Sequence, residues 1–186
     1  MTFTFVELFG GIGGGSLGMQ RAGMTPVAFV EIDPFCQAVL REHHPGVPIF
    51  GDVHDVGARN LPPCDLIAGG FPCQPVSQAG QRRGRADDRW LWPEFARVVR
   101  ELRPRYALLE NVRGLLVPYR DDDGGWHGAP VEEVLGDLAD LGYDSWWRVI
   151  SAAEVGAAHE RQRVWVVAVP CGGGQRSEQQ HVHAGE

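Results

Sequence analysis

Short apolar runs along the chain alternate with segments of helical periodicity. The third helical segment is the clearest, because Phe95, Val98, Val99 and Leu102 form an i, i+3, i+4, i+7 stripe. Strands are predicted at Thr2–Phe9, Val27–Ile32, Ile49–Val53, Asp65–Ala68, Tyr106–Asn111, Trp146–Ile150 and Val164–Val169. Helices are predicted from the glycine-rich loop 10–15 through Ala22, and over Pro34–His43, Pro93–Leu102 and Val131–Leu141. This alternation predicts an α/β fold with a mostly parallel sheet.

Three stretches fall outside the alternation. Gln78–Arg89 is polar and arginine-rich, and is long enough to be a functional loop. Tyr119–Gly128 is expected to be a surface excursion, and Pro170–Glu186 a flexible tail. We therefore expect one domain over residues 1–169 followed by a tail over 170–186.

Composition narrows the class of protein. A chain of 186 residues with 44% hydrophobic residues can bury a core as one domain. The mean hydropathy is −0.19, and no apolar run approaches the ~20 residues that cross a bilayer. The first residues carry an early acid and no basic region, so a cytoplasmic protein without membrane attachment is expected. The four cysteines form no C-x-x-C pair, so neither a disulfide framework nor a metal site is predicted.

Charge is unevenly distributed. The net charge is −7, yet residues 81–113 contain nine arginines against five acids. All 17 basic residues are arginine, which a GC-rich genome accounts for. Arginine is nevertheless the better bidentate ligand of phosphate, so the local cluster is a candidate contact with nucleic acid.

Cys73 is the candidate nucleophile. It follows the strand Asp65–Ala68 in the run Gly69-Gly70-Phe71-Pro72-Cys73-Gln74-Pro75. The carboxyl edge of an open α/β sheet is where ligands bind, and Pro72 restricts the backbone that presents the thiol. A lone cysteine is more often a buried structural residue, but this setting favours covalent catalysis. We assign no function to Cys36, Cys64 or Cys171.

The glycine-rich turn after the first strand is a candidate cofactor site. Gly13–Gly18 matches G-x-G-x-x-G, with Glu31 and Asp33 placed to bind ribose hydroxyls, although such turns also serve packing alone. The aromatic Phe9 suits stacking on a heterocycle. The acid Glu7 suits a cationic ligand better than a pyrophosphate. Adenosyl-methionine is therefore favoured over a nicotinamide cofactor.

Two further sets of polar residues lie next to apolar strands. Glu110 comes after Tyr106–Leu109 and could be an acid for proton exchange, or a structural carboxylate paired with Arg113. Arg161 and Arg163 precede or enter the last strand, where R-x-R spacing would point both guanidinium groups to one face. In isolation that segment is more commonly a solvated charge run.

Taken together, these motifs resemble the C5-cytosine-specific DNA methyltransferases over about residues 3–169. Phe71-Pro72-Cys73-Gln74 is similar to the family's catalytic loop, and Glu110-Asn111-Val112 to its Glu-Asn-Val. Phe9–Gly14 resembles the cofactor-binding first motif, although Glu7 stands where the family usually has aspartate. His159 replaces the glutamine of the family's Gln-x-Arg-x-Arg.

The resemblance implies a Rossmann-like S-adenosylmethionine-dependent methyltransferase fold, with helices on both faces of a mostly parallel sheet. It implies S-adenosyl-L-methionine as cofactor and double-stranded DNA as substrate. The implied catalytic residues are Cys73, Glu110, Arg161 and Arg163. The implied cofactor-binding residues are Phe9, Gly11, Gly13, Gly14, Glu31, Ile32, Asp52, Val53 and Pro72, and the implied DNA-binding residues are Gln74, Ser77, Arg82, Arg83 and Arg85.

The resemblance also implies the chemistry. The Cys73 thiolate would add to C6 of a cytosine flipped out of the duplex, which makes C5 nucleophilic towards the methyl group. Glu110 would bond to N3 and Arg163 to O2 of the ring. Loss of the C5 proton and of the thiol then releases 5-methylcytosine.

Family enzymes continue into a target-recognition domain and a last helix, and this chain stops about where those begin. The sequence therefore leaves other functions open: a non-catalytic DNA-binding module, a catalytic half whose target recognition comes from a separate chain, and a transfer-RNA cytosine methyltransferase. For the isolated chain we expect weak DNA binding with a steep salt dependence and little sequence preference.

Overall fold

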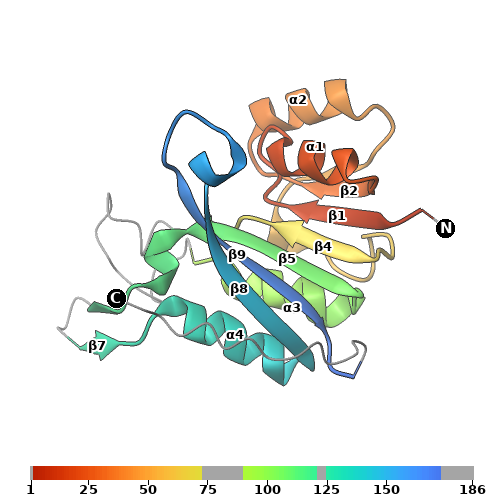
Figure 1. Ribbon diagram of the computed structural model, residues 1–186. Helices are drawn as coiled ribbons and strands as arrows, with labels where there is room; N and C mark the ends of the chain where they lie inside the picture. The colour runs from red at the N-terminus through yellow and green to blue at the C-terminus, as the bar shows by residue number, and fades with distance from the viewer. Residues whose placement is uncertain (1, 73–89, 121–124, 173–186) are drawn as a thin grey trace.

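The computed structural model describes residues 2–72, 90–120 and 125–172. Its centre is a seven-stranded sheet in the order β3-β2-β1-β4-β5-β9-β8 (Figure 1). The strands are β1 (Thr4–Leu8), β2 (Thr25–Val30), β3 (Ile49–Phe50), β4 (Leu66–Gly69), β5 (Tyr106–Val112), β8 (Tyr143–Ser151) and β9 (Gln162–Pro170). Strands β3, β2, β1, β4 and β5 are parallel, while β9 is antiparallel to both β5 and β8. The predicted mostly parallel α/β fold is confirmed.

Helices cover the sheet from both faces, as predicted (Figure 1). Helices α1 (Gly14–Arg21) and α2 (Pro34–His43) lie on one face, and α3 (Trp92–Leu102) and α4 (Pro130–Asp140) on the other. Proline stands in the first turn of α2, α3 and α4, where its missing N–H costs no hydrogen bond. The side chain of Asp33 caps α2 by accepting from the N–H of Cys36 at 2.9 Å.

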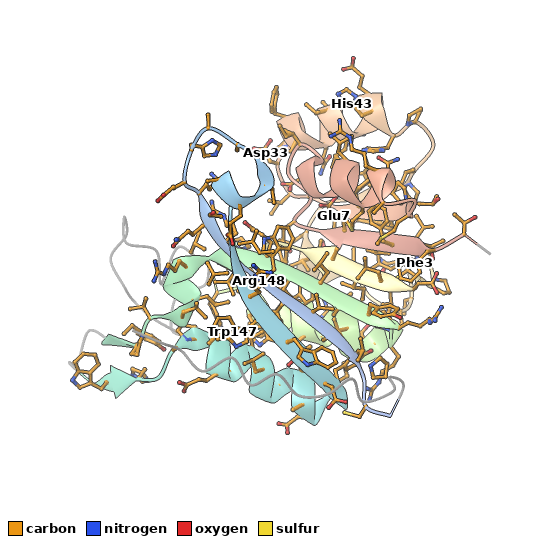
Figure 2. All side chains as sticks on the ribbon, viewed as in Figure 1. Phe3, Glu7, Asp33, His43, Trp147 and Arg148 are labelled. Atoms are coloured by element: carbon orange, nitrogen blue, oxygen red, sulfur yellow. The ribbon has the colours of Figure 1, made fainter. Side chains whose placement is uncertain are left out.

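Two hydrophobic cores fill the space between these layers (Figure 2). Alternation along β1 sends Val6 and Leu8 into the larger core beneath α3 and α4. Phe5 faces the other way, into the smaller core with Met19 of α1 and Leu40 of α2. Residues at odd positions of β1 are therefore on the α1/α2 face.

Several predicted boundaries were wrong in detail. The strand expected at 49–53 ends at Phe50, and Val53–Asp55 form a 3₁₀ turn (η1) capped by the side chain of Asp52. The expected surface excursion contains two short paired strands, β6 (Tyr119–Arg120) and β7 (Trp126–His127). Tyr119 is buried and stacks on His127 with ring centroids 4.9 Å apart.

The end of the described chain also differs from the prediction. Strand β9 includes Pro170, and the N–H of Cys171 donates to the carbonyl of Gly142 at 2.8 Å. Pro170 and Cys171 therefore belong to the described fold, and residues 173–186 lie outside the described part. Among the described residues, no helix is long and apolar enough to cross a membrane.

Candidate active site

The carboxyl ends of the parallel strands bring most of the predicted site residues to one edge of the sheet. Phe9 follows β1, Glu31 follows β2, Asp52 follows β3, and the segment 70–72 follows β4. Glu110 is on β5, beside that segment: a Cβ built at Gly70 would lie 2.8 Å from Glu110 Oε2. These groups come together because the carboxyl ends of parallel strands meet at one edge, where open α/β sheets bind ligands.

A cleft of about 260 Å³ contains the acids predicted to bind a nucleoside. Its lining includes Phe9, Glu31, Ile32, Asp52, Val53 and Pro72. Six residues predicted to bind cofactor from four separate segments therefore share one cleft. Ile32 is 68% exposed, so one flank of this cleft presents an apolar side chain to any ligand.

Glu31 is held in place by backbone donors. Its Oε2 accepts from the N–H of Gly11 at 2.7 Å, and its Oε1 accepts from the N–H of Asp33 at 2.8 Å. A carboxylate has about four acceptor sites, so two remain for a ligand. The carboxylate thus joins the glycine turn to the end of β2 and can still accept hydrogen bonds from vicinal hydroxyls.

Asp52 is the second acid of this cleft. Its carboxylate accepts from the N–H of His54 at 2.9 Å and lies 2.6 Å from His54 Nδ1. The backbone hydrogen bond is the main cause that lowers the pKa of Asp52. Asp52 is therefore a fixed anion suited to accepting from an amino group.

The turn after β1 has an unusual backbone. Phe9, which is not glycine, has φ of 57°, and Gly11 and Gly13 have φ of 52° and 86°. A non-glycine residue in this region costs roughly 1–3 kcal/mol, and such strain concentrates at functional sites. The turn brings the Gly11 N–H to Glu31 and lets α1 begin at Gly14.

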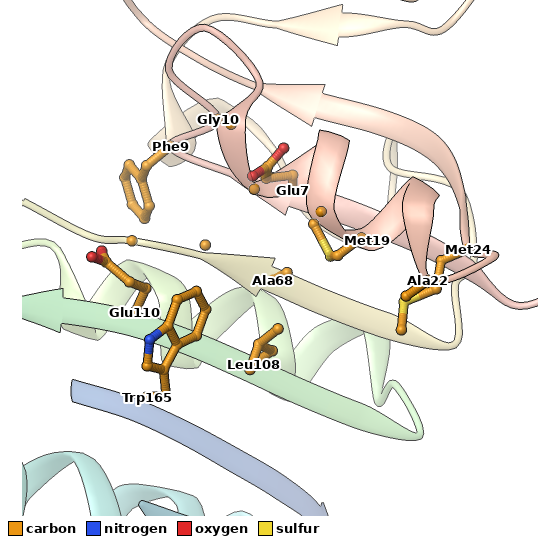
Figure 3. A pocket seen from close by; sticks show the side chains of 15 residues that line it. Glu7, Phe9, Gly10, Met19, Ala22, Met24, Ala68, Leu108, Glu110 and Trp165 are labelled. Atoms are coloured by element: carbon orange, nitrogen blue, oxygen red, sulfur yellow. The ribbon is translucent and has the colours of Figure 1, made fainter. Parts of the chain in front are cut away.

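A second, larger cleft of about 640 Å³ adjoins the first, because Phe9 and Gly70 line both. Figure 3 shows Glu7 and Phe9 on one side and Glu110 and Trp165 on the other. Pockets for small molecules commonly measure about 300–1,000 Å³. The two adjoining clefts are together large enough for a ligand with two parts.

Glu110 forms an ion pair with Arg163 within reach of the larger cleft. Nε of Arg163 lies 2.6 Å from Oε1 of Glu110, and the side chains are 20% and 32% exposed. The antiparallel register pairs Glu110 with Trp165 and Val112 with Arg163. Alternation therefore puts Glu110, Arg163 and Trp165 on the same face of the sheet.

The two arginines predicted to act together have different places in the structure. Arg163 is in β9 and reaches Glu110, whereas Arg161 precedes the strand and is exposed. Among the described residues, Glu110 pairs with Arg163 and not with Arg161 or Arg113. Arg113 instead donates to Oε1 of Gln162 at 2.8 Å. The period-two argument therefore applies to Arg163 within β9, and a shared face with Arg161 stays a prediction.

The base of the predicted catalytic loop is firmly packed. Phe71 is buried against Trp90, Trp92 and Phe95, with ring centroids 5.3 to 6.5 Å away. The buried side-chain amide of Asn111 donates to the carbonyl of Phe71 at 3.1 Å. The predicted residues Cys73, Gln74, Ser77, Arg82, Arg83 and Arg85 lie outside the described part of the chain.

The other three cysteines do not compete for the nucleophile's role. Burial raises the pKa of Cys64 to about 11. The pKa values of Cys36 and Cys171 are also raised, with desolvation as the main cause. A nucleophilic cysteine needs the thiolate, so these thiols are poor candidates. In the described segments no cluster of three His, Cys, Asp or Glu could hold a metal ion.

Two lining residues were missed as site residues: Glu7 and Trp165. Glu7 was predicted to suit a cationic ligand but was not assigned to the site, although an acid between the apolar Val6 and Leu8 indicates a buried carboxyl group. Trp165 could not be placed from the sequence, because its position depends on the register of β9 against β5.

Gly15 provides a test of this packing. A Cβ on Gly15 would collide with Oε1 of Glu7, whereas a Cβ on Gly18, in the same helix, would meet nothing within 4 Å. Gly15→Ala is expected to lower the free energy of unfolding by about 1–3 kcal/mol. Gly18→Ala should leave it unchanged or raise it by up to about 1 kcal/mol. Urea denaturation of both variants checks this, and equal stabilities would contradict the packing.

Comparison with known proteins agrees with this geometry. The family model for the C-5 cytosine-specific DNA methylase matches residues 3–182. The chain therefore belongs to the C-5 cytosine-specific DNA methylase family, whose methyl donor is S-adenosyl-L-methionine.

The chain is similar to several bacterial proteins of this kind. It is 38% identical to the type II methyltransferase M.NgoMIV of Neisseria gonorrhoeae, over 91% of this chain and 52% of that protein. It is 37% identical to the type II methyltransferase M2.BsuMI of Bacillus subtilis, over 88% of this chain and 41% of that protein. The chain thus spans about half, or less, of the length of these relatives.

A solved structure shows the same fold. The Dnmt2 methyltransferase of S. pombe superposes with a TM-score of 0.71 at 20% sequence identity, over 93% of this chain and 51% of that one.

Proposed function

We propose that this protein transfers a methyl group from S-adenosyl-L-methionine to C5 of cytosine in double-stranded DNA. The observation that carries the proposal is the Glu110–Arg163 ion pair beside Gly70, two residues from Pro72 and three from Cys73. It offers an acid and a cation to one planar ring next to the candidate nucleophile. Family membership and the similarity to two type II methyltransferases support the same chemistry.

The residues of the two clefts fit the methyl donor. Glu31 keeps acceptor sites for ribose hydroxyls, Asp52 accepts from an amino group, and Phe9 presents an aromatic ring between the clefts. The strained turn brings these groups together without side chains at Gly11, Gly13 or Gly14. The bound donor supplies a methyl group activated by a sulfonium centre.

The chain's own residues then act on the base. The Cys73 thiolate adds to C6 of cytosine, so that electron density moves to C5. Glu110 bonds to N3 and Arg163 to O2, which stabilises the charge that develops on the ring. C5 takes the methyl group as the bond from that group to the donor's sulfur breaks, and loss of the C5 proton to solvent with expulsion of the thiolate completes the reaction. The base must leave the helix because C6 is inaccessible in stacked DNA.

Contacts with the DNA backbone are assigned to the segment after Cys73. Gln74, Ser77, Arg82, Arg83 and Arg85 belong to this segment, and the arginine excess of residues 81–113 supports phosphate binding there. Arg161, which precedes β9 and is exposed, is available for the same role.

The test is transfer of a labelled methyl group to two duplexes of identical mixed sequence. One contains cytosine and the other contains 5-methylcytosine at every cytosine position. We expect label only in the first duplex. Donor binding without transfer to any DNA would support a non-catalytic binding module, and transfer to transfer RNA alone would support an RNA methyltransferase.

A further inference from the structure

Strand β8 is a long and regular strand at the edge of the sheet. It has nine residues, Tyr143–Ser151, and in the described part of the chain it pairs only with β9 (Figure 1). The register between the two strands is continuous, and β8 contains neither proline nor glycine. Proteins usually protect such edges with short strands, bulges or proline, because an exposed edge pairs readily with another strand. The edge of β8 is therefore a candidate surface for strand pairing.

Backbone hydrogen bonds at the two ends of the β8–β9 ladder show which residues of β8 face outwards. The N–H of Ala152 donates to the carbonyl of Arg161 at 3.1 Å, and the N–H of Cys171 donates to the carbonyl of Gly142 at 2.8 Å. Even-numbered residues of β8 thus form the hydrogen-bonded pairs with β9. The N–H and C=O groups of the odd-numbered residues point away from β9, where a further strand can pair with them.

Large apolar side chains lie on both faces of this edge. Trp146 is 60% exposed and pairs with Val167 of β9, which is itself 40% exposed. Trp147 is 46% exposed and pairs with Val166, which belongs to the larger core on the other face of the sheet. A strand paired with β8 would cover part of both tryptophans, and aromatic pairs across strands are stabilising.

The charges on this edge are placed symmetrically. Asp144 stands two residues before Trp146 and Arg148 two residues after it, so all three side chains share one face of the sheet. Within the chain, Oδ1 of Asp144 accepts from the thiol of Cys171 at 3.6 Å, and Nη2 of Arg148 lies 3.5 Å from Oε1 of Glu154. Both contacts are long and join exposed groups, so neither opposes a new ion pair.

We propose that β8 pairs with β8 of a second copy of this chain, antiparallel about a two-fold axis at Trp146. In this register Asp144 of each copy lies opposite Arg148 of the other, and Trp146 meets Trp146 of the second copy. These are non-hydrogen-bonded pairs, in which side chains approach most closely, while Ser145 and Trp147 exchange backbone hydrogen bonds. A slip of two residues in either direction leaves Asp144 and Arg148 without opposite charges, so the side chains select this register.

Antiparallel pairing determines how the two candidate sites are arranged. Strand β8 ends at Ser151, opposite Gln162 and beside Arg163 of the site, whereas Tyr143 lies at the far edge of the sheet. Because the strands of the two copies run in opposite directions, the two sites open at opposite edges of one continuous sheet. The pairing therefore assembles two copies without adding residues to either site, and it does not depend on the proposed reaction.

Sedimentation equilibrium under reducing conditions, over a wide range of protein concentration, measures the pairing. One strand pair with its flanking side chains buries less surface than the roughly 1,200–2,000 Å² of stable interfaces, so we expect a reversible monomer–dimer equilibrium. Asp144→Arg and Arg148→Asp each replace two attractive charge pairs by two repulsive ones. Each variant alone should therefore dimerise about 10- to 100-fold more weakly than the wild-type protein.

An equimolar mixture of these two variants is the decisive experiment. In a dimer with one copy of each, both positions again hold opposite charges, so the mixture should associate about as tightly as the wild-type protein. Glu154→Gln is the matched control, because it frees Arg148 without changing a paired residue and should not weaken the dimer. Circular dichroism of each variant shows that it is folded.

Trp146→Ser tests the same axis without a change of charge and should also weaken the dimer. A wild-type protein that is monomeric at every concentration would overturn the proposal and leave this edge to a strand of another kind. A dimer that both charge reversals leave intact, or two folded variants that do not associate when mixed, would overturn it as well.

Discussion

Cys73→Ser is expected to abolish methyl transfer to DNA, with a loss of at least about a thousandfold. A serine hydroxyl is almost fully protonated at neutral pH, so it cannot add to C6 as a thiolate does. DNA that contains 5-fluorocytosine provides the direct readout. The fluorine replaces the proton that must leave C5, so the wild-type protein should form an adduct with this DNA that survives denaturing electrophoresis, and Cys73→Ser should form none.

The other cysteines supply matched controls. Burial holds the pKa of Cys64 at about 11, and the pKa of Cys36 is also raised. Cys64→Ser and Cys36→Ser should therefore keep both the adduct and the activity. An adduct that persists in Cys73→Ser, or disappears only in Cys64→Ser, would show that the nucleophile was wrongly assigned.

The sequence predicted those parts of the site that depend on strand ends. Glu31 and Asp52 each follow a short apolar run, and parallel pairing brings them to one edge. Local side-chain hydrogen bonds determined where these strands end. The side chain of Asp52 accepts from the His54 N–H, which stabilises a 3₁₀ turn where a longer strand was expected.

Contacts across the sheet could not be predicted in the same way. The Glu110–Arg163 pair depends on the antiparallel register of β9 against β5, which no local pattern specifies. The unpaired oxygen of Glu7 likewise depends on how closely the first turn of α1 approaches β1. By contrast, the β6–β7 pair had a local signal, since the turn residues Asp121–Gly125 separate Tyr119 from Trp126.

Arg163→Ala is expected to lower the rate of methyl transfer by about 10²–10³-fold while leaving cofactor affinity nearly unchanged. Arg163 holds Glu110 through a 2.6 Å contact and is the proposed donor to O2 of cytosine. It is not among the residues that line either cleft, so the loss should appear in kcat. Single-turnover kinetics with labelled donor, together with calorimetry of donor binding, separates the two effects.

Arg113→Ala is the matched control, because Arg113 donates to the side chain of Gln162 rather than to Glu110. A double-mutant cycle with Glu110→Gln then tests whether the ion pair acts as a unit. If Glu110 and Arg163 stabilise the same ring, the double variant should be little slower than the slower single variant. Rate losses that simply multiply, or an equal loss in Arg113→Ala, would show that Arg163 contributes through general electrostatics and not through its contact with Glu110.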